Sequence, residues 1–148
     1  MRKYQIYASI FALLVTCIEA KAGDKEDVMA KVSSWSTLLA AGDIEALEMT
    51  PHTRFGRSGG LLNIVNPKQI KAWLSSSGVK INIQNHHGDV EIYGDAAVYT
   101  GYESVNITPP NGESRQDTNR ITIVFAKNKG DWEVVHVHVS SLTPVNPE

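Results

Sequence analysis

The chain has few of the features that build a disulfide scaffold, a membrane span or a nucleic-acid surface. Its only cysteine is Cys17, so no disulfide can form within the chain. The apolar run at residues 6–18 is shorter than the roughly 20 residues that a permanent spanning helix needs. Acidic residues outnumber basic ones by 16 to 14, whereas nucleic acids and anionic membranes require a basic face. These counts argue against nucleic acid or a membrane as a partner.

The N-terminus has the pattern of a secretory signal peptide. A basic start precedes the apolar run, and Ala20-Lys-Ala22 places small residues at the spacing of a cleavage site. We therefore expect cleavage after Ala22 and export of residues 23–148 to the periplasm or the exterior. Lipid anchoring at Cys17 is disfavoured, because Thr16 stands where a lipoprotein box usually has a smaller residue.

Residues 23–148 have a suitable length for one domain with one core. The signal peptide contains three basic residues and one acidic residue, so its removal shifts the net charge from −2 to −4. No internal repeat, low-complexity tract or linker divides the remaining sequence.

The first part of this domain predicts helices. Asp24 is a candidate N-cap and Gly42 a candidate stop for a helix whose apolar face recurs at i, i+4, i+7 and i+11: Val28, Val32, Trp35 and Leu39. The segment Asp43–Glu48 predicts a second, short helix. A third helix is expected to begin at Pro67, after Asn66, and to end at Gly78.

The second part predicts strands. Alternating or β-branched runs cover residues 61–65, 79–83, 90–93, 96–107, 120–126 and 132–140, whereas residues 52–60 indicate a loop or irregular strand in which His52 is exposed. Helices followed by antiparallel strands indicate an α+β domain. We expect a curved antiparallel sheet wrapped around the N-terminal helices, with a conical cavity between them.

The last two strands form a predicted hairpin. Strict alternation in the second run places Trp132, His136 and His138 on one face, and Val137 and Val139 on the other. Neither face is simply polar, so both faces of this strand are expected to be covered.

The run Gly130-Asp-Trp-Glu-Val-Val-His-Val-His-Val-Ser140 resembles the last strand of the SnoaL-like branch of the nuclear transport factor 2-like superfamily. Within it, the chain most resembles the association domain of calcium/calmodulin-dependent protein kinase II. The similarity extends through residues 116–118, 94–97 and 41–46, so it covers nearly all of the chain after residue 24. The resemblance implies a cystatin-like cone. It does not imply one function, because the superfamily includes isomerases, dehydratases, cyclases and non-catalytic hubs.

The interior of such a cone predicts a ligand pocket lined by Trp35, Trp73, Tyr99, Glu103, Ile123, Val137 and Val139. Glu103 is the candidate general base, because a carboxyl group desolvated on a cavity wall acquires a raised pKa. The alternative is an ordinary exposed or salt-bridged residue. No serine or cysteine nucleophile motif, phosphate loop or paired-carboxylate signature is present, so catalysis stays open.

The hub relatives also suggest the charge of the ligand. Their cavity arginines bind small carboxylates, and the matching positions here are Glu103, Ile123 and Val139. The resemblance therefore implies a neutral ligand, unless Arg54 or Arg57 in the preceding loop substitutes. Arg120 is expected on the opposite face of its strand from Ile123.

The histidines offer two interpretations. His136 and His138 have the spacing of a metal-binding pair, but no third ligand follows at motif spacing, and relatives keep the pair without a metal. We expect no metal or cofactor. His86 and His87 are adjacent, so a regular strand would direct them to opposite faces.

Three functions are compatible with these patterns. The preferred hypothesis is an exported domain that binds a small, neutral molecule and dimerises through the face bearing Trp132, His136 and His138. The alternatives are a small isomerase, dehydratase or cyclase, and an oligomerisation module without a ligand.

Overall fold

The computed structural model describes residues 23–56 and 62–142. Residues 23–41 are helical, and the remaining elements follow in the order β1 (His52–Phe55), β2 (Asn63–Val65), α2 (Pro67–Ser77), β3 (Lys80–Tyr93), β4 (Ala96–Thr108), β5 (Arg115–Asn128) and β6 (Asp131–Ser141). None of the described helices is long and apolar enough to cross a membrane. The expected signal peptide, with Cys17 and Ala22, lies outside the described residues, as does Arg57.

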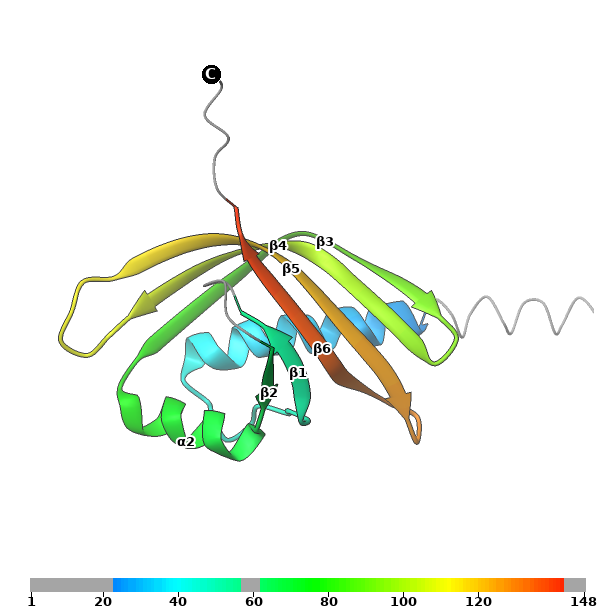
Figure 1. The fold of residues 1–148 in the computed structure, drawn as a ribbon, viewed down its shortest axis with the longest axis horizontal. Helices are drawn as coiled ribbons and strands as arrows, with labels where there is room; N and C mark the ends of the chain where they lie inside the picture. Colours follow the sequence, from blue (N-terminus) through cyan, green and yellow to red (C-terminus); the bar gives the residue numbers. More distant parts are fainter. Residues whose placement is uncertain (1–22, 57–61, 143–148) are drawn as a thin grey trace, which may run out of the picture.

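The expected α+β architecture is confirmed. Six strands form one sheet in the order β2-β1-β6-β5-β4-β3, in which only the β1–β6 pair is parallel. The sheet curves without closing, residues 23–41 run beneath its concave face, and α2 lies below one end of the arch (Figure 1). Long strands joined by short turns place alternate side chains of β3 to β6 on the concave face.

The main core lies between the N-terminal helix and the concave face. Val28 and Val32 from the predicted helical stripe are buried there. The sheet supplies the other side of this core through Val90, Ile92, Ala97, Tyr99, Ile123, Phe125, Trp132, Val134, Val137 and Val139. The helical stripe was therefore predicted correctly from its spacing.

Asp24 does not cap that helix, because residue 23 is already helical. Its carboxylate instead forms a partly buried ion pair with Lys127 and accepts a hydrogen bond from Nε1 of Trp132 at 3.3 Å. The ammonium group of Lys127 lies 5.1 Å from the centre of the Trp132 ring. The predicted cap is thus a tertiary anchor between the helix and the last hairpin.

The predicted short helix at Asp43–Glu48 is wrong. The segment forms a turn, in which the Asp43 carboxylate accepts from the backbone N–H of Ala46 at 3.3 Å. The chain does not continue as a helix because Leu47 is buried and the Glu48 carbonyl accepts from Nε1 of Trp35 at 3.1 Å. Tertiary contacts have overridden a local capping signal.

The predicted boundaries of α2 are confirmed. The side chain of Asn66 accepts hydrogen bonds from the backbone N–H groups of Lys68 and Gln69, Pro67 occupies the first turn, and Gly78 ends the helix with φ of 66°. Glycine adopts this left-handed conformation without steric cost, which explains its place after the last helical residue.

Residues 80–93 form one strand, not the two short strands that we expected. Its pairing with β4 shifts between His86 and Asp89, and His87 has a φ of 51°. Because of this bulge both histidine side chains lie on the convex face of the sheet. His86 Nε2 lies 3.1 Å from the Ser104 hydroxyl, and the His87 ring packs edge-on against Tyr102. The prediction that the pair points to opposite faces is wrong.

A second bulge, in β6, makes the predicted faces of this strand wrong for the residues before it. Val124 pairs with His136, but the next residue, Phe125, pairs with Val134, so Val135 is an extra residue. An extra residue reverses the alternation beyond it. Trp132 is consequently only 3% exposed and belongs to the core, on the opposite side of the sheet from His136. Trp132 cannot share a dimer face with the two histidines.

Candidate functional site

A cavity of about 430 Å³ lies beneath the concave face of the sheet. Its apolar wall comes from the N-terminal helix, the following turn, α2 and the sheet, and includes Val32, Trp35, Leu39, Leu47, Met49, Ile70, Trp73, Ile81, Ile83, Val105, Ile121, Ile123, Val137 and Val139. Its polar lining consists of Ser36, His52, Arg54, Asn85, Glu103, Asp117 and Asn119. The volume is within the usual range for small-molecule sites.

The structure brings together six of the seven residues that we assigned to the pocket: Trp35, Trp73, Glu103, Ile123, Val137 and Val139. Trp73 is 51% exposed and marks the open side. Tyr99 does not line the cavity, because it is buried in the adjoining core. The six residues come from the N-terminal helix, α2, β4, β5 and β6, so only the folded chain forms this site.

The most buried polar residues of the cavity are Glu103 and Asn119. They are 6% and 3% exposed and lie opposite each other on β4 and β5. Nδ2 of Asn119 donates a hydrogen bond to Oε1 of Glu103 at 3.0 Å. Asn85 is the partner of Glu103 on β3, so three polar side chains form a row across three neighbouring strands. This polar row interrupts an otherwise aliphatic wall.

Tyr99 is packed tightly against two glycines. A Cβ atom at Gly88 would lie 2.6 Å from its hydroxyl oxygen, and one at Gly101 would lie 2.8 Å away. Among the described residues this hydroxyl has no hydrogen-bond partner. Burial raises the pKa of the Tyr99 phenol, and the charge of Glu103 raises it further. The phenol is therefore a neutral core group.

His52 is buried, contrary to the expectation that it is exposed in a loop. It belongs to β1 and lines the cavity, and its Nδ1 lies 2.8 Å from the Thr50 carbonyl oxygen. Burial lowers the pKa of His52, the hydrogen bond to Thr50 opposes that shift, and the nearby Arg54 and His136 add to it. The neutral imidazole is favoured, with Nδ1–H donating to the carbonyl group.

Arg54 and Arg120 are the described candidates to replace the cavity arginines of the hub relatives, and of these two only Arg54 lines the cavity. Arg54 lines the cavity from β1 but is exposed, so its charge lies towards solvent. Arg120 is exposed on β5, between the inward-facing residues Asn119 and Ile121, as its alternation predicts. Asp117, which also lines the cavity, forms an ion pair with Arg115 at 2.9 Å.

His136 and His138 lie on the convex face of the sheet. Nδ1 of His136 is 2.7 Å from the hydroxyl oxygen of Thr53, and both imidazoles pack edge-on against the ring of Phe55. The parallel pairing of β1 with β6 creates these contacts. Across the described residues no group of three or more histidine, cysteine, aspartate or glutamate side chains is arranged to hold a metal ion.

Sequence reasoning missed Asn85 and Asn119 as site residues. The available signal was their position: each occupies an inward-facing place in a strand, where a polar side chain must find a partner. Asn119 alternates with Ile121 and Ile123, so its inward direction could have been deduced. Its pairing with Glu103 could not, because that depends on the register between β4 and β5.

The chain is similar to a known domain family and to solved structures of the same fold. A family model described as a SnoaL-like domain matches residues 28–144. An NTF2-like superfamily protein from Salmonella enterica superposes with a TM-score of 0.69 at 17% identity, covering 84% of this chain and 95% of that one. A candidate dehydratase of the NTF2-like family from Streptomyces avermitilis gives a TM-score of 0.68 at 17% identity, covering 84% and 99%.

The hub relatives also match. The CaMKII hub from S. rosetta superposes with a TM-score of 0.64 at 23% identity, covering 80% of this chain and 96% of that one. No curated protein sequence matches the chain significantly. At these identities the structural likeness establishes the fold alone, and the neighbours include both an enzyme candidate and an assembly domain.

Proposed function

Because the chain belongs to the SnoaL-like domain family, we propose that it is an exported domain that binds a small, neutral molecule in the cavity beneath its sheet. The observation that carries this proposal is a cavity of about 430 Å³ with an extended apolar wall and the buried Glu103–Asn119 pair. A few fixed polar groups within an apolar pocket are typical of sites that orient a small ligand.

The charges of the lining support a neutral ligand over a carboxylate. Among the described lining residues, Glu103 and Asp117 are acidic and only Arg54 is basic, apart from the neutral His52. Arg54 is exposed, whereas Glu103 is buried. A carboxylate deep in the cavity would lack the charge-assisted hydrogen bonds that usually hold it, because the buried lining that the structure describes there carries an acidic side chain and no positively charged one.

A calorimetric and thermal-shift screen of neutral molecules against their carboxylate analogues tests this proposal. We expect neutral aromatic and aliphatic compounds to raise the melting temperature and the carboxylates to have little effect. Glu103→Gln should weaken the discrimination against carboxylates, and Glu91→Gln on the exposed side of β3 is the matched control. Tight binding of carboxylates by the wild-type protein would contradict the proposal.

An enzymatic function is the second candidate, because Glu103 is a buried carboxylate on a cavity wall, where a general base would stand. Tyr99 is not available to assist it from within the cavity. If Glu103→Gln abolishes turnover of a neutral carbonyl compound but leaves its binding intact, the isomerase or dehydratase function is favoured.

The third candidate is an oligomerisation module, which would assemble but bind no ligand. The similarity of the fold to hub domains supports this candidate.

A further inference from the structure

The side chain of His52 projects from β1 towards the cavity. Its neighbour Thr53 and the next alternate residue, Phe55, contact His136 and His138 on the convex face. Successive side chains of a strand point to opposite faces, so His52 lies on the concave side. There it is one of the lining residues of the cavity and is 7% exposed. Only the edge of the imidazole is therefore open, and it opens beneath the sheet.

The hydrogen bond to Thr50 determines which nitrogen of His52 is free. Nδ1 lies 2.8 Å from the Thr50 carbonyl oxygen, and a carbonyl group can only accept, so Nδ1 carries the proton. In the neutral imidazole, Nε2 is then a hydrogen-bond acceptor at the distal edge of the ring. No described residue donates to Nε2. The enclosed polar atoms without a partner are the Tyr99 hydroxyl and Asn119 Oδ1 among the described residues, and Nε2 is not one of them.

Threonine hydroxyls on both sides of His52 fix this segment to the bulge in β6. The Thr50 hydroxyl donates to the Val134 carbonyl at 2.8 Å, and the Thr53 hydroxyl donates to the carbonyl of Val135, the extra residue of the bulge, at 3.3 Å. Thr50, whose own carbonyl orients the imidazole, is thereby held in place. The Nε2 acceptor is preorganised, so a ligand that binds it has little side-chain entropy to remove.

The cavity wall next to His52 is aliphatic. The inward-facing residues on the adjoining strands are Val65, which pairs with His52 on β2, and Val137, which pairs with Arg54 on β6. Both valines are buried and have no polar side-chain atom, and Arg54 is exposed. An acceptor beside an apolar wall is matched by a molecule that covers the wall with an apolar body and brings one donor.

On the basis of the proposed function, we propose that His52 anchors the ligand by accepting a hydrogen bond at Nε2, so that the site selects neutral molecules with an apolar body and a hydroxyl or N–H donor. This is a binding role and requires no reaction. The order of the sheet places β1 three strands from β4, about 14 Å along the sheet. The anchor is therefore separate from the Glu103–Asn119 pair.

Indole and benzofuran test this inference, because they have nearly the same shape but only indole has an N–H donor. By calorimetry we expect the wild-type protein to bind indole at least about tenfold more tightly than benzofuran, because benzofuran leaves the Nε2 acceptor without a donor. The measurement is made at about pH 8, above the unperturbed histidine pKa of about 6.5, so that the imidazole is neutral.

Two variants locate the effect, and a third serves as a control. His52→Phe removes the acceptor but keeps an aromatic ring, and it should bring the ratio of the two affinities close to one. His52→Gln has an amide that can turn to accept or to donate, so it should also lower the ratio, and it tests the inference even if His52→Phe does not fold. His86→Gln, at an exposed position of the convex face, should leave the ratio unchanged.

The outcomes separate this inference from the function on which it rests. Equal binding of indole and benzofuran by the wild-type protein overturns the anchor and leaves the apolar site in place. A preference for indole that survives both substitutions of His52 also overturns it, because another group must then accept from indole. If neither compound binds, the proposed function and this inference are overturned together.

Discussion

The side chains of Asp24 and Trp132 meet although 108 residues separate them in the sequence, and Nε1 of Trp132 donates to Oδ1 of Asp24 at 3.3 Å. Lys127 completes this contact through its ion pair with the same carboxylate. The three residues join the start of the described chain to its last hairpin. They hold the N-terminal helix against the sheet and so maintain one wall of the cavity.

Loss of this anchor should destabilise the fold. We expect Asp24→Ala to lower the free energy of unfolding by about 1–3 kcal/mol, because it leaves a partly buried ammonium group and an indole N–H without their acceptor. Urea denaturation measures the change. Asp27→Ala, at an exposed position of the same helix, should alter stability by less than about 0.5 kcal/mol. Equal effects of the two substitutions would show that Asp24 acts only as a surface charge.

The close packing of Tyr99 predicts a specific steric coupling. Gly101→Ala should cost about 1–3 kcal/mol, because its Cβ atom would lie 2.8 Å from the Tyr99 hydroxyl oxygen in a filled core. The cost should be smaller in a Tyr99→Phe background, where that oxygen is absent. A double-mutant cycle in urea measures the difference. Gly56→Ala, which has open space around it, is the control, and an unchanged cost in both backgrounds would refute the coupling.

Buried His52 should make the protein sensitive to acid. Because burial lowers its pKa in the folded state, the unfolded chain binds more protons below the unperturbed pKa of about 6.5. The stability that depends on neutral His52 is therefore complete above about pH 6.5 and declines as the pH falls towards the folded-state pKa. We expect His52→Gln to flatten the pH dependence of the urea midpoint in this range. Parallel curves for the two proteins would contradict the assignment.

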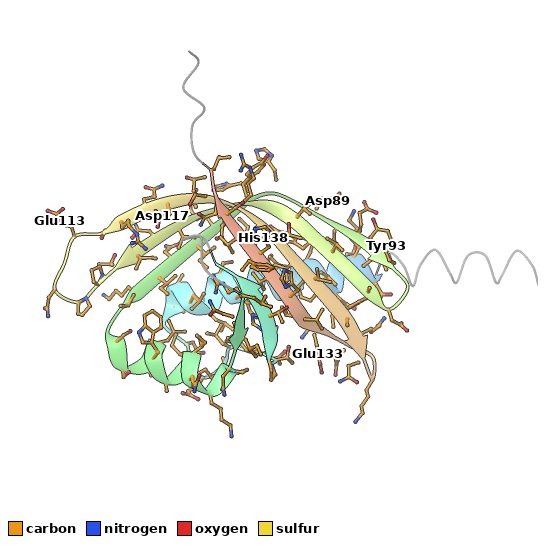
Figure 2. All side chains as sticks on the ribbon, viewed as in Figure 1. Asp89, Tyr93, Glu113, Asp117, Glu133 and His138 are labelled. Atoms are coloured by element: carbon orange, nitrogen blue, oxygen red, sulfur yellow. The ribbon has the colours of Figure 1, made fainter. Side chains whose placement is uncertain are left out.

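We expect the protein to form a homodimer through the convex face of its sheet. This face carries His136, His138 and Tyr102, but not Trp132. Val124→Lys, next to His136 in the pairing of β5 with β6, should raise the dimer dissociation constant at least tenfold in light-scattering titrations. Glu113→Lys is the control: Glu113 projects from the β4–β5 turn, away from the middle of the sheet (Figure 2). A wild-type monomer at micromolar concentration would contradict the prediction.

The sequence also predicts the start of the mature protein. N-terminal sequencing of material secreted by the native host should begin at Gly23, because the cleavage pattern ends at Ala22. Asp24 would then be the second residue of the mature chain, already in place to contact Trp132. A lipid-modified start at Cys17 would contradict this prediction.

Elements whose signals are local could be predicted from the sequence. The caps of α2 depend on Asn66, Pro67 and Gly78, which act within a few residues of themselves. The cavity wall at Ile123 could be predicted because β5 alternates regularly through that position. These features require only the period of a helix or strand and the chemistry of its ends.

The two bulges could not be predicted, and they account for the main errors in the predicted faces. Val134 and Val135 are identical in chemistry, so the pattern does not reveal which of them is the extra residue. His87 adopts a positive φ, which is uncommon for residues other than glycine, so a regular strand was the simpler expectation. In both places the register with the neighbouring strand decides the outcome, and pairing between strands is not a local property.

The bulge in β3 has a consequence for strand addition at the edge of the sheet. β3 is an edge of the sheet and is 14 residues long, and a flat edge of that length offers backbone groups on which another chain could add a strand. The irregularity between His86 and Asp89 divides this edge into two shorter, misaligned segments, and the charged residues Lys80 and Glu91 occupy them. Incoming strands therefore find no continuous template. The same distortion that turns both imidazoles outward interrupts the edge at which a further strand could add to the sheet.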